Sequence, residues 1–311
     1  MKKIKLRLFG FLLCFLMALN LLPIKTFADI PLDIAEKSNL QVVFEIDGEK
    51  AKDVTFKAYK VAAVTSSYEF TVEPKFEKAD IIKLLDNPDT ESYNIIATTI
   101  TGFIAENTQI KPDYTAVTDK SGSAVFKEAD RGLYLITGDI YKTESAYYIP
   151  QNFMVLLPTQ KSDGSLNYNV KAIVKWEKRA VNEKLNLEIL KIWGDSAENL
   201  HTDDNVTVKL YKNGKLYDSK ILNRNNNWNY KWKNLPSDAL WTVKENELKG
   251  YTASVERKKD CFVITNTPKK HNKIPPKLPQ TGLLVWPVPV ALSLGILLIL
   301  LGVTEKRKGE K

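Results

Sequence analysis

The 311-residue sequence has few of the side chains that most often bind metals or act as nucleophiles, with only two cysteines and two histidines. His201 and His271 lie far apart in polar sequence, and no HxxxH, CxxC or carboxylate cluster has metal-ligand spacing. GxGxxG, GxxxxGK[S/T] and GxSxG motifs are also missing. We therefore expect no metal, no cofactor and no turnover enzyme.

The residues between the two ends have no excess of basic side chains, although the net charge of the whole sequence is +8. Residues 1–28 carry five basic and no acidic residues, and residues 282–311 carry four basic and two acidic ones. Residues 29–281 keep a net charge of only +1. The basic charge belongs to the two ends, so it is no evidence for nucleic acid as a partner.

Long hydrophobic runs occur only at the two ends. The N-terminal run FLLCFLMALNLLPI follows a basic segment and precedes Thr26 and Ala28. This order predicts a secretory signal peptide, residues 1–28, cleaved after Ala28. An uncleaved membrane anchor is the alternative, but the run is short for a span. Cleavage would leave Cys261 as the only cysteine, so we expect no intrachain disulfide.

The C-terminal run, 283–303, is 21 residues long and uncharged, and the basic tail TEKRKGEK follows it. The pentapeptide that precedes it is Leu278, Pro279, Gln280, Thr281 and Gly282. This order resembles the cell-wall sorting signal of Gram-positive surface proteins. The resemblance implies that a sortase cuts between Thr281 and Gly282, joins the Thr281 carbonyl to an amine and removes 282–311. A single-pass membrane protein is the alternative.

Residues 184–268 contain short alternating or β-branched runs separated by turn signals, which favours an antiparallel sandwich of immunoglobulin type. Asn213-Gly214 between VKLYK and KLYDS predicts a two-residue hairpin. The runs LKIW, VTVKLYKNG, NNNWNYKWKNLP, WTVKENELKGY and FVITNT are similar to the collagen-adhesin B-type (Cna-B) domain. We place this domain at 181–268.

The Cna-B resemblance implies an internal isopeptide bond between Lys191 of LKIW and Asn266 of ITNT, promoted by Glu245 of WTVKE. Burial disfavours the charged forms, so Lys191 would be a neutral amine and Glu245 a protonated acid. The amine would attack the Asn266 carbonyl while Glu245 shuttles protons and ammonia leaves, once per molecule. The alternatives are structural: a lysine at a strand edge, a solvated glutamate and an asparagine in a turn.

Residues 29–180 also contain strand-like runs, with Asp47-Gly48 as a hairpin turn. Two segments, ADIIKLLDN and TESYNIIATTITGFIAEN, have apolar residues at helical spacing instead. We expect one packing face of the second segment to contain Ile95, Ile96, Thr99, Ile100, Phe103 and Ile104.

The runs FKAYKVA, TDKSGSAVFKEADRGLYLI and YYIPQNFMVLLP resemble the N-terminal domains of minor pilins in sortase-built pili. Two features depart from shaft pilins. No YPKN-like motif ends the domain, and the first strand LQVVFEIDG has no lysine for an internal bond. An acceptor lysine for the shaft stays unidentified; the candidates are Lys57, Lys60, Lys171 and Lys175.

These observations predict an all-β fold of two immunoglobulin-like, Cna-B-type sandwiches in tandem, the first with a helical insertion. The proline-containing segment 269–281 is a spacer that leads to the sorting motif. The resemblance implies a secreted, wall-anchored minor pilin, the basal subunit that joins a covalent pilus to peptidoglycan. Its expected partners are a sortase, peptidoglycan and a pilus shaft subunit. The alternative is an accessory or tip pilin, or a stand-alone adhesin that binds host matrix or cells.

Overall fold

The structure is a computed structural model that describes residues 37–269, except for 66, 87, 195–200 and 202–203. The predicted signal peptide, the spacer beyond residue 269, the sorting motif 278–282 and the apolar run 283–303 lie outside the described residues. Within residues 37–269 and their gaps, no helix is long and apolar enough to cross a membrane.

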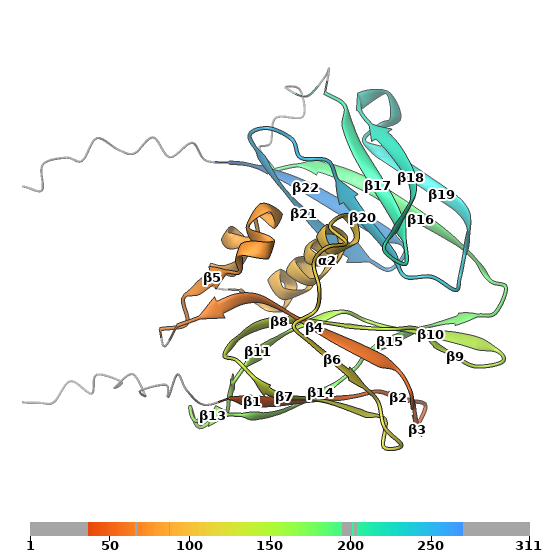
Figure 1. The fold of residues 1–311 in the computed structure, drawn as a ribbon. Helices are drawn as coiled ribbons and strands as arrows, with labels where there is room; N and C mark the ends of the chain where they lie inside the picture. Colours follow the sequence, from red (N-terminus) through yellow and green to blue (C-terminus); the bar gives the residue numbers. More distant parts are fainter. Residues whose placement is uncertain (1–36, 66, 87, 195–200, 202–203, 270–311) are drawn as a thin grey trace, which may run out of the picture. The chain divides into compact units, whose positions relative to one another are not determined.

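The first strand-rich region extends from β1 to β15 (Figure 1). Its strands are β1 (Ser38–Val43), β2 (Glu45–Ile46), β3 (Glu49–Lys50), β4 (Thr55–Val64), β5 (Phe70–Val72), β6 (Tyr114–Val117), β7 (Ser123–Ala129), β8 (Gly132–Gly138), β9 (Tyr141–Lys142), β10 (Ala146–Pro150), β11 (Phe153–Leu157), β12 (Thr159–Gln160), β13 (Leu166–Asn167), β14 (Asn169–Ile173) and β15 (Trp176–Ala180). Between β5 and β6 the chain forms the 3-10 helices η1 (Pro74–Ala79) and η2 (Ile82–Leu85), then the α-helix α2 (Thr90–Glu106).

Three larger sheets of this region have the orders β14-β1-β7, β11-β8-β4-β5 and β15-β10-β9, with β6 paired to β4, and β2-β3 and β12-β13 form two-stranded sheets. The first strand, β1, is the parallel neighbour of β14. Leu40, Val42 and Phe44 point into an apolar core and are fully buried. Asp47 and Gly48 have φ values of 51° and 90°, so the predicted hairpin turn between β2 and β3 is confirmed.

The helical insertion is confirmed for its second segment only. The Asp89 carboxylate accepts a hydrogen bond from the Ser92 backbone N–H at 2.8 Å and caps the start of α2. The first segment, 79–87, forms no α-helix but only the short η2. Asp80, with φ at 54°, is in the left-handed region, which interrupts a right-handed helix.

The second strand-rich region extends from β16 to β22. Its elements are β16 (Lys184–Trp193), β17 (Val206–Lys212), β18 (Lys215–Leu222), η4 (Arg224–Asn226), β19 (Asn229–Pro236), β20 (Trp241–Glu245), β21 (Tyr251–Lys258) and β22 (Cys261–Pro268). They form two sheets, β19-β16-β22-β21 and β18-β17-β20, around an apolar core. The predicted Asn213-Gly214 turn is confirmed, with φ values of 49° and 75°. The sequence analysis missed β21.

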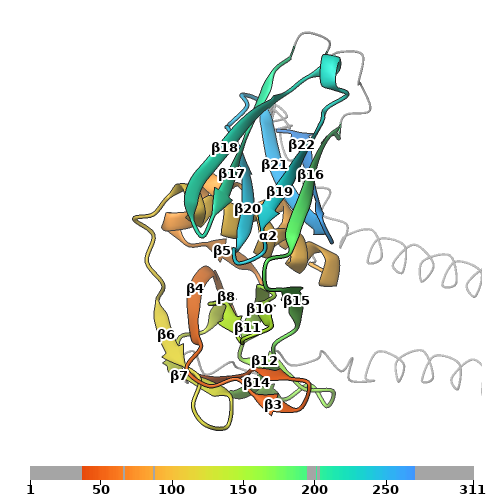
Figure 2. The same cartoon turned by 90° about the vertical axis from the view of Figure 1, so that its right-hand side faces the viewer.

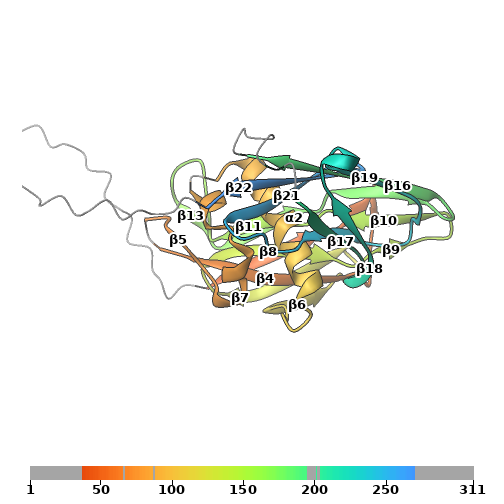
Figure 3. The same ribbon diagram turned by 90° about the horizontal axis from the view of Figure 1, so that it is seen from above.

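The helix α2 packs against both regions (Figures 2 and 3). Ile96, Ile100 and Phe103 join Val61, Leu133 and other side chains of the first region in a third apolar cluster. Another part of the helix contacts β20 and β21 of the second region. Of the predicted packing face, Ile96, Thr99, Ile100 and Phe103 are buried, whereas Ile95 and Ile104 are half-buried. The mostly β fold, with two strand-rich regions and a helix in the first, is confirmed.

Candidate cross-linking site

The strand β16 alternates between exposed and buried residues, and this alternation places Lys191 on the buried face. β22, its parallel neighbour, carries Asn266 on the same inner side. The register pairs Lys191 with Ile264 and Trp193 with Asn266. Lys191 and Asn266 are therefore diagonal neighbours on one face of one sheet.

Glu245 comes from the facing sheet, at the end of β20. Lys191, Glu245 and Asn266 are only 3%, 1% and 0% exposed, respectively. The Asn266 side-chain Nδ2 donates a hydrogen bond to Glu245 Oε1 at 2.6 Å. Burial raises the pKa of Glu245, and the positive charge of Lys191 and the Asn266 hydrogen bond only partly oppose this shift. Burial therefore shifts this carboxyl toward its protonated form.

The polar groups of the site are only partly satisfied. Lys191 Nζ donates to the Ile192 carbonyl at 2.8 Å and lies 4.1 Å from the centre of the Trp193 ring. Glu245 Oε2 and Asn266 Oδ1 are buried without a hydrogen-bond partner. Rotating the Asn266 amide by half a turn would let a protonated Glu245 donate to Oδ1, which would polarise the carbonyl for attack. The three residues that the sequence singled out are thus gathered in one dry pocket.

The Trp193 ring beside Lys191 belongs to an aromatic cluster that the sequence did not identify as part of the site. Trp193 stacks on His201 with ring centres 3.5 Å apart and makes edge contacts with Trp228 and Tyr251. His201 is 4% exposed, although the sequence around it is polar. Asp204 Oδ2 lies 2.6 Å from His201 Nδ1. This cluster keeps water away from the amine.

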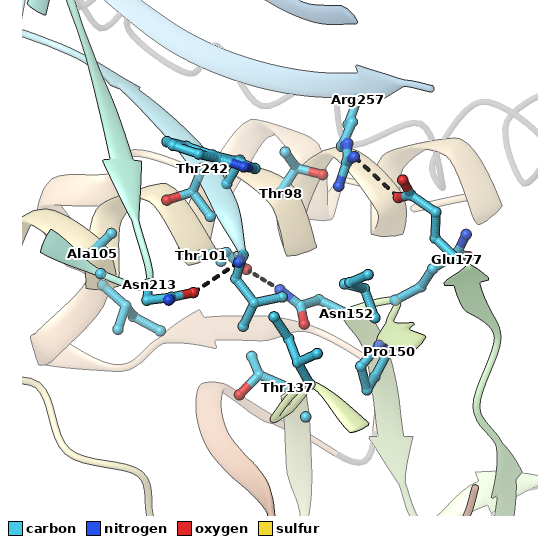
Figure 4. Close-up of a pocket in the computed structure, with 18 of the residues that line it drawn as sticks. Thr98, Thr101, Ala105, Thr137, Pro150, Asn152, Glu177, Asn213, Thr242 and Arg257 are labelled. Atoms are coloured by element: carbon cyan, nitrogen blue, oxygen red, sulfur yellow. Dashed lines mark hydrogen bonds and ion pairs between the residues drawn. The ribbon is translucent and has the colours of Figure 1, made fainter. Parts of the chain in front are cut away.

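A second feature is a cleft of about 1020 Å³ that both regions line (Figure 4). Thr98, Thr101 and Ala105 of α2 face it, and Asn152 donates to Thr101 Oγ1 at 3.0 Å. Ion pairs along the cleft include Lys57 with Asp139 at 3.1 Å, Arg179 with Glu177 at 2.7 Å and Arg257 with Glu177 at 3.2 Å. Burial opposes ionisation of Glu177, but Arg179 and Arg257 lower its pKa overall. Among the described residues, no cluster of His, Cys, Asp and Glu could hold a metal.

Comparison with known proteins identifies the second region. Residues 187–267 match the family model of the Cna protein B-type domain. No curated protein sequence matches the chain.

Several solved structures are similar to the chain. A single B repeat unit of the collagen-binding surface protein of Staphylococcus aureus is 16% identical, with 75% of this chain and 98% of that chain covered and a TM-score of 0.26. The SpaB basal pilin of Lactobacillus rhamnosus GG is 13% identical, with 46% of this chain and 98% of that chain covered and a TM-score of 0.30. The minor pilin GBS52 of Streptococcus agalactiae is 14% identical, with 76% of this chain and 99% of that chain covered and a TM-score of 0.26.

Scores this low do not carry the function of those proteins over to this one. The family match covers β16 to β22 of the second region, and Lys191, Glu245 and Asn266 lie within it. Residues 187–267 thus match the Cna protein B-type domain, and the chain has structural similarity to Cna B repeats and to Gram-positive pilins.

Proposed function

We propose that the protein is a wall-anchored minor pilin, the basal subunit that joins a covalent pilus to peptidoglycan. The observation that carries this proposal is the buried Lys191–Glu245–Asn266 site in the Cna-B domain. A bond there would join the first and last strands of the domain, which suits a subunit held under tension. The sorting motif 278–282, the spacer and the signal peptide support a wall address.

In the proposed reaction, Lys191 transfers a proton to Glu245, which leaves a neutral amine and a neutral acid in the apolar site. The amine nitrogen attacks Asn266 Cγ, and Glu245 donates a hydrogen bond to the carbonyl oxygen as negative charge develops. Glu245 then passes the second amine proton to Nδ2. The Cγ–Nδ2 bond breaks, ammonia leaves, and an amide bond between Lys191 and Asn266 remains. No oxidant or cofactor is needed, because the fold itself supplies the proximity.

The basal role needs an acceptor lysine for the shaft, and the four candidates differ in their surroundings. Lys57 and Lys60 are in ion pairs, Lys57 with Asp139 at 3.1 Å and Lys60 with Glu73 at 3.4 Å. Lys171 and Lys175 are exposed, and no ion pair among the described residues involves them. Lys171 also lies on β14, an edge strand, where a transferring enzyme could reach it. This favours Lys171 and Lys175 as acceptors.

The direct test is a blot of muramidase-released wall proteins with antibody to residues 29–281. The proposal predicts a high-mass ladder, and Lys171→Arg with Lys175→Arg should abolish it while Lys57→Arg with Lys60→Arg should not. A single band near the monomer mass would contradict a pilin and favour a stand-alone adhesin. Deleting the gene should release intact pili into the medium if the subunit is basal; pili that stay on the wall would indicate an accessory or tip position.

A further inference from the structure

The helix α2 belongs to the first region in sequence, but it contacts the two strands that flank the cross-linking site of the second. β20 and β21 are edge strands of the two facing sheets of the Cna-B sandwich. β20 carries Glu245, and β21 pairs with β22, where Ala253 is opposite Asn266. The contacts of α2 thus reach both halves of the site through one strand each.

The contact with β20 requires a glycine. Gly102 lies so close to this strand that an added Cβ would be 2.2 Å from the Val243 carbonyl oxygen. Val243 and Lys244 lead directly into Glu245. Lower on the helix, Glu106 accepts from Lys209 Nζ at 2.7 Å and lies 3.7 Å from Lys244 Nζ. Although burial opposes it, these lysines lower the pKa of Glu106, so the acid stays charged.

The contact with β21 is a hydrogen bond to its free edge. The Val255 backbone N–H donates to Thr99 Oγ1 at 2.9 Å, and that hydroxyl lies 3.5 Å from the Val255 carbonyl. Val255 is opposite Ile264 in the ladder that carries Asn266. Thr99 and Gly102 are three residues apart, so they lie on one face of the helix. One helical turn therefore spans the open edge between the two sheets.

We propose that α2 positions the cross-linking site: Thr99 and Gly102 hold β20 and β21 at the separation at which Glu245 meets Asn266. The inference rests on the bond assigned in the proposed function. It makes the maturation ordered, because the first region must fold and dock its helix before the second can close its bond. The coupling is reciprocal, since a bond that fixes β22 also fixes the β21 edge that holds Thr99.

The test uses freshly synthesised protein of residues 29–281, the form left by both expected cleavages, and follows the loss of one ammonia by intact mass over time. Thr99→Val removes the hydroxyl at nearly constant shape, and Gly102→Ala adds the clashing Cβ while it favours the helix itself. A displacement of about 1 Å in a reaction centre costs on the order of tenfold to a hundredfold in rate. Both variants should therefore link at least about tenfold more slowly than the wild type.

Two controls make the result specific. Thr98→Val changes the neighbouring threonine, which donates to Asn94 within the helix and faces the cleft, and should link at the wild-type rate. Thr99→Ser keeps the hydroxyl and should restore the rate. If Gly102→Ala does not fold, the comparison of Thr99→Val with Thr99→Ser tests the inference. Equal rates in Thr99→Val and wild type would overturn the inference alone, whereas a wild type that never loses ammonia would overturn the bond as well.

Discussion

The two sandwiches have a similar parallel strand pair, but the inner faces of these pairs carry different side chains. Each pairs its first strand in parallel with a strand from near its C-terminal end, β1 with β14 and β16 with β22. In the first region the inner face of this pair is apolar, with Leu40, Val42 and Val170 buried. In the second, the inner face carries Lys191 and Asn266, with Glu245 opposite. The same topology thus supports packing alone in one region and an arrangement suited to a covalent bond in the other.

The largest expected effect is the loss of the cross-link, which would leave the second region with packing alone, like the first. Glu245→Gln keeps the shape of the site but cannot exchange protons, so the bond should not form. A cross-link from 191 to 266 closes a long loop, and by analogy with disulfides its loss should lower the free energy of unfolding by about 4 kcal/mol. Denaturant unfolding of both proteins measures this. Glu247→Gln at an exposed position is the matched control, and equal stability of Glu245→Gln and wild type would contradict the account.

Core truncations should affect the two regions alike, because they act on the folded state whether or not a cross-link is present. Leu40→Ala in the first core and Leu187→Ala in the second remove fully buried side chains. Each should cost about 3 kcal/mol of unfolding free energy. Val125→Ala, at a position 43% exposed, is the control and should cost much less. An unaffected second region in Leu187→Ala would show that the cross-link hides packing defects.

The buried carboxyl of Glu245 should make the stability of the second region depend on pH, and Lys191→Met isolates this effect from the bond. In Lys191→Met, burial keeps the pKa of Glu245 raised, so the folded state holds a proton that the unfolded state has lost. Unfolding free energy should then fall as pH rises from about 4.3 to the raised pKa, by at most about 1.4 kcal/mol per pH unit. The control Lys191→Met/Glu245→Gln should lack this slope; equal slopes in both proteins would refute it.

The smallest effect compares the two hairpin turns. Gly48 and Gly214 have φ values of 90° and 75°, and an added Cβ would meet no atom within 4 Å at either position. Replacement by alanine therefore tests backbone strain alone. Gly48→Ala and Gly214→Ala should each cost about 1 kcal/mol in thermal or denaturant unfolding. A much larger cost at Gly214 would mean that its turn contributes to the cross-linking site.

The sequence predicted the features that depend on local patterns or on the family resemblance. Alternation placed Lys191, Glu245 and Asn266 on strands, and the Asn213-Gly214 pair predicted its turn. It could not reveal that α2 reaches the second region, because the contact of Thr99 with Val255 joins residues far apart in sequence and uses an ordinary threonine. The burial of His201 was missed because the sequence around it is polar, and nothing in that sequence showed that its ring stacks on Trp193 of β16.

The most direct measurement is the intact mass of residues 29–281, followed by tandem mass spectrometry of a protease digest. The account predicts a mass lower than the sequence mass by one ammonia and a branched peptide in which Lys191 is joined to Asn266. Glu245→Gln should have its full sequence mass and no branched peptide. A wild-type protein of full sequence mass would contradict the central claim that this core builds a covalent bond.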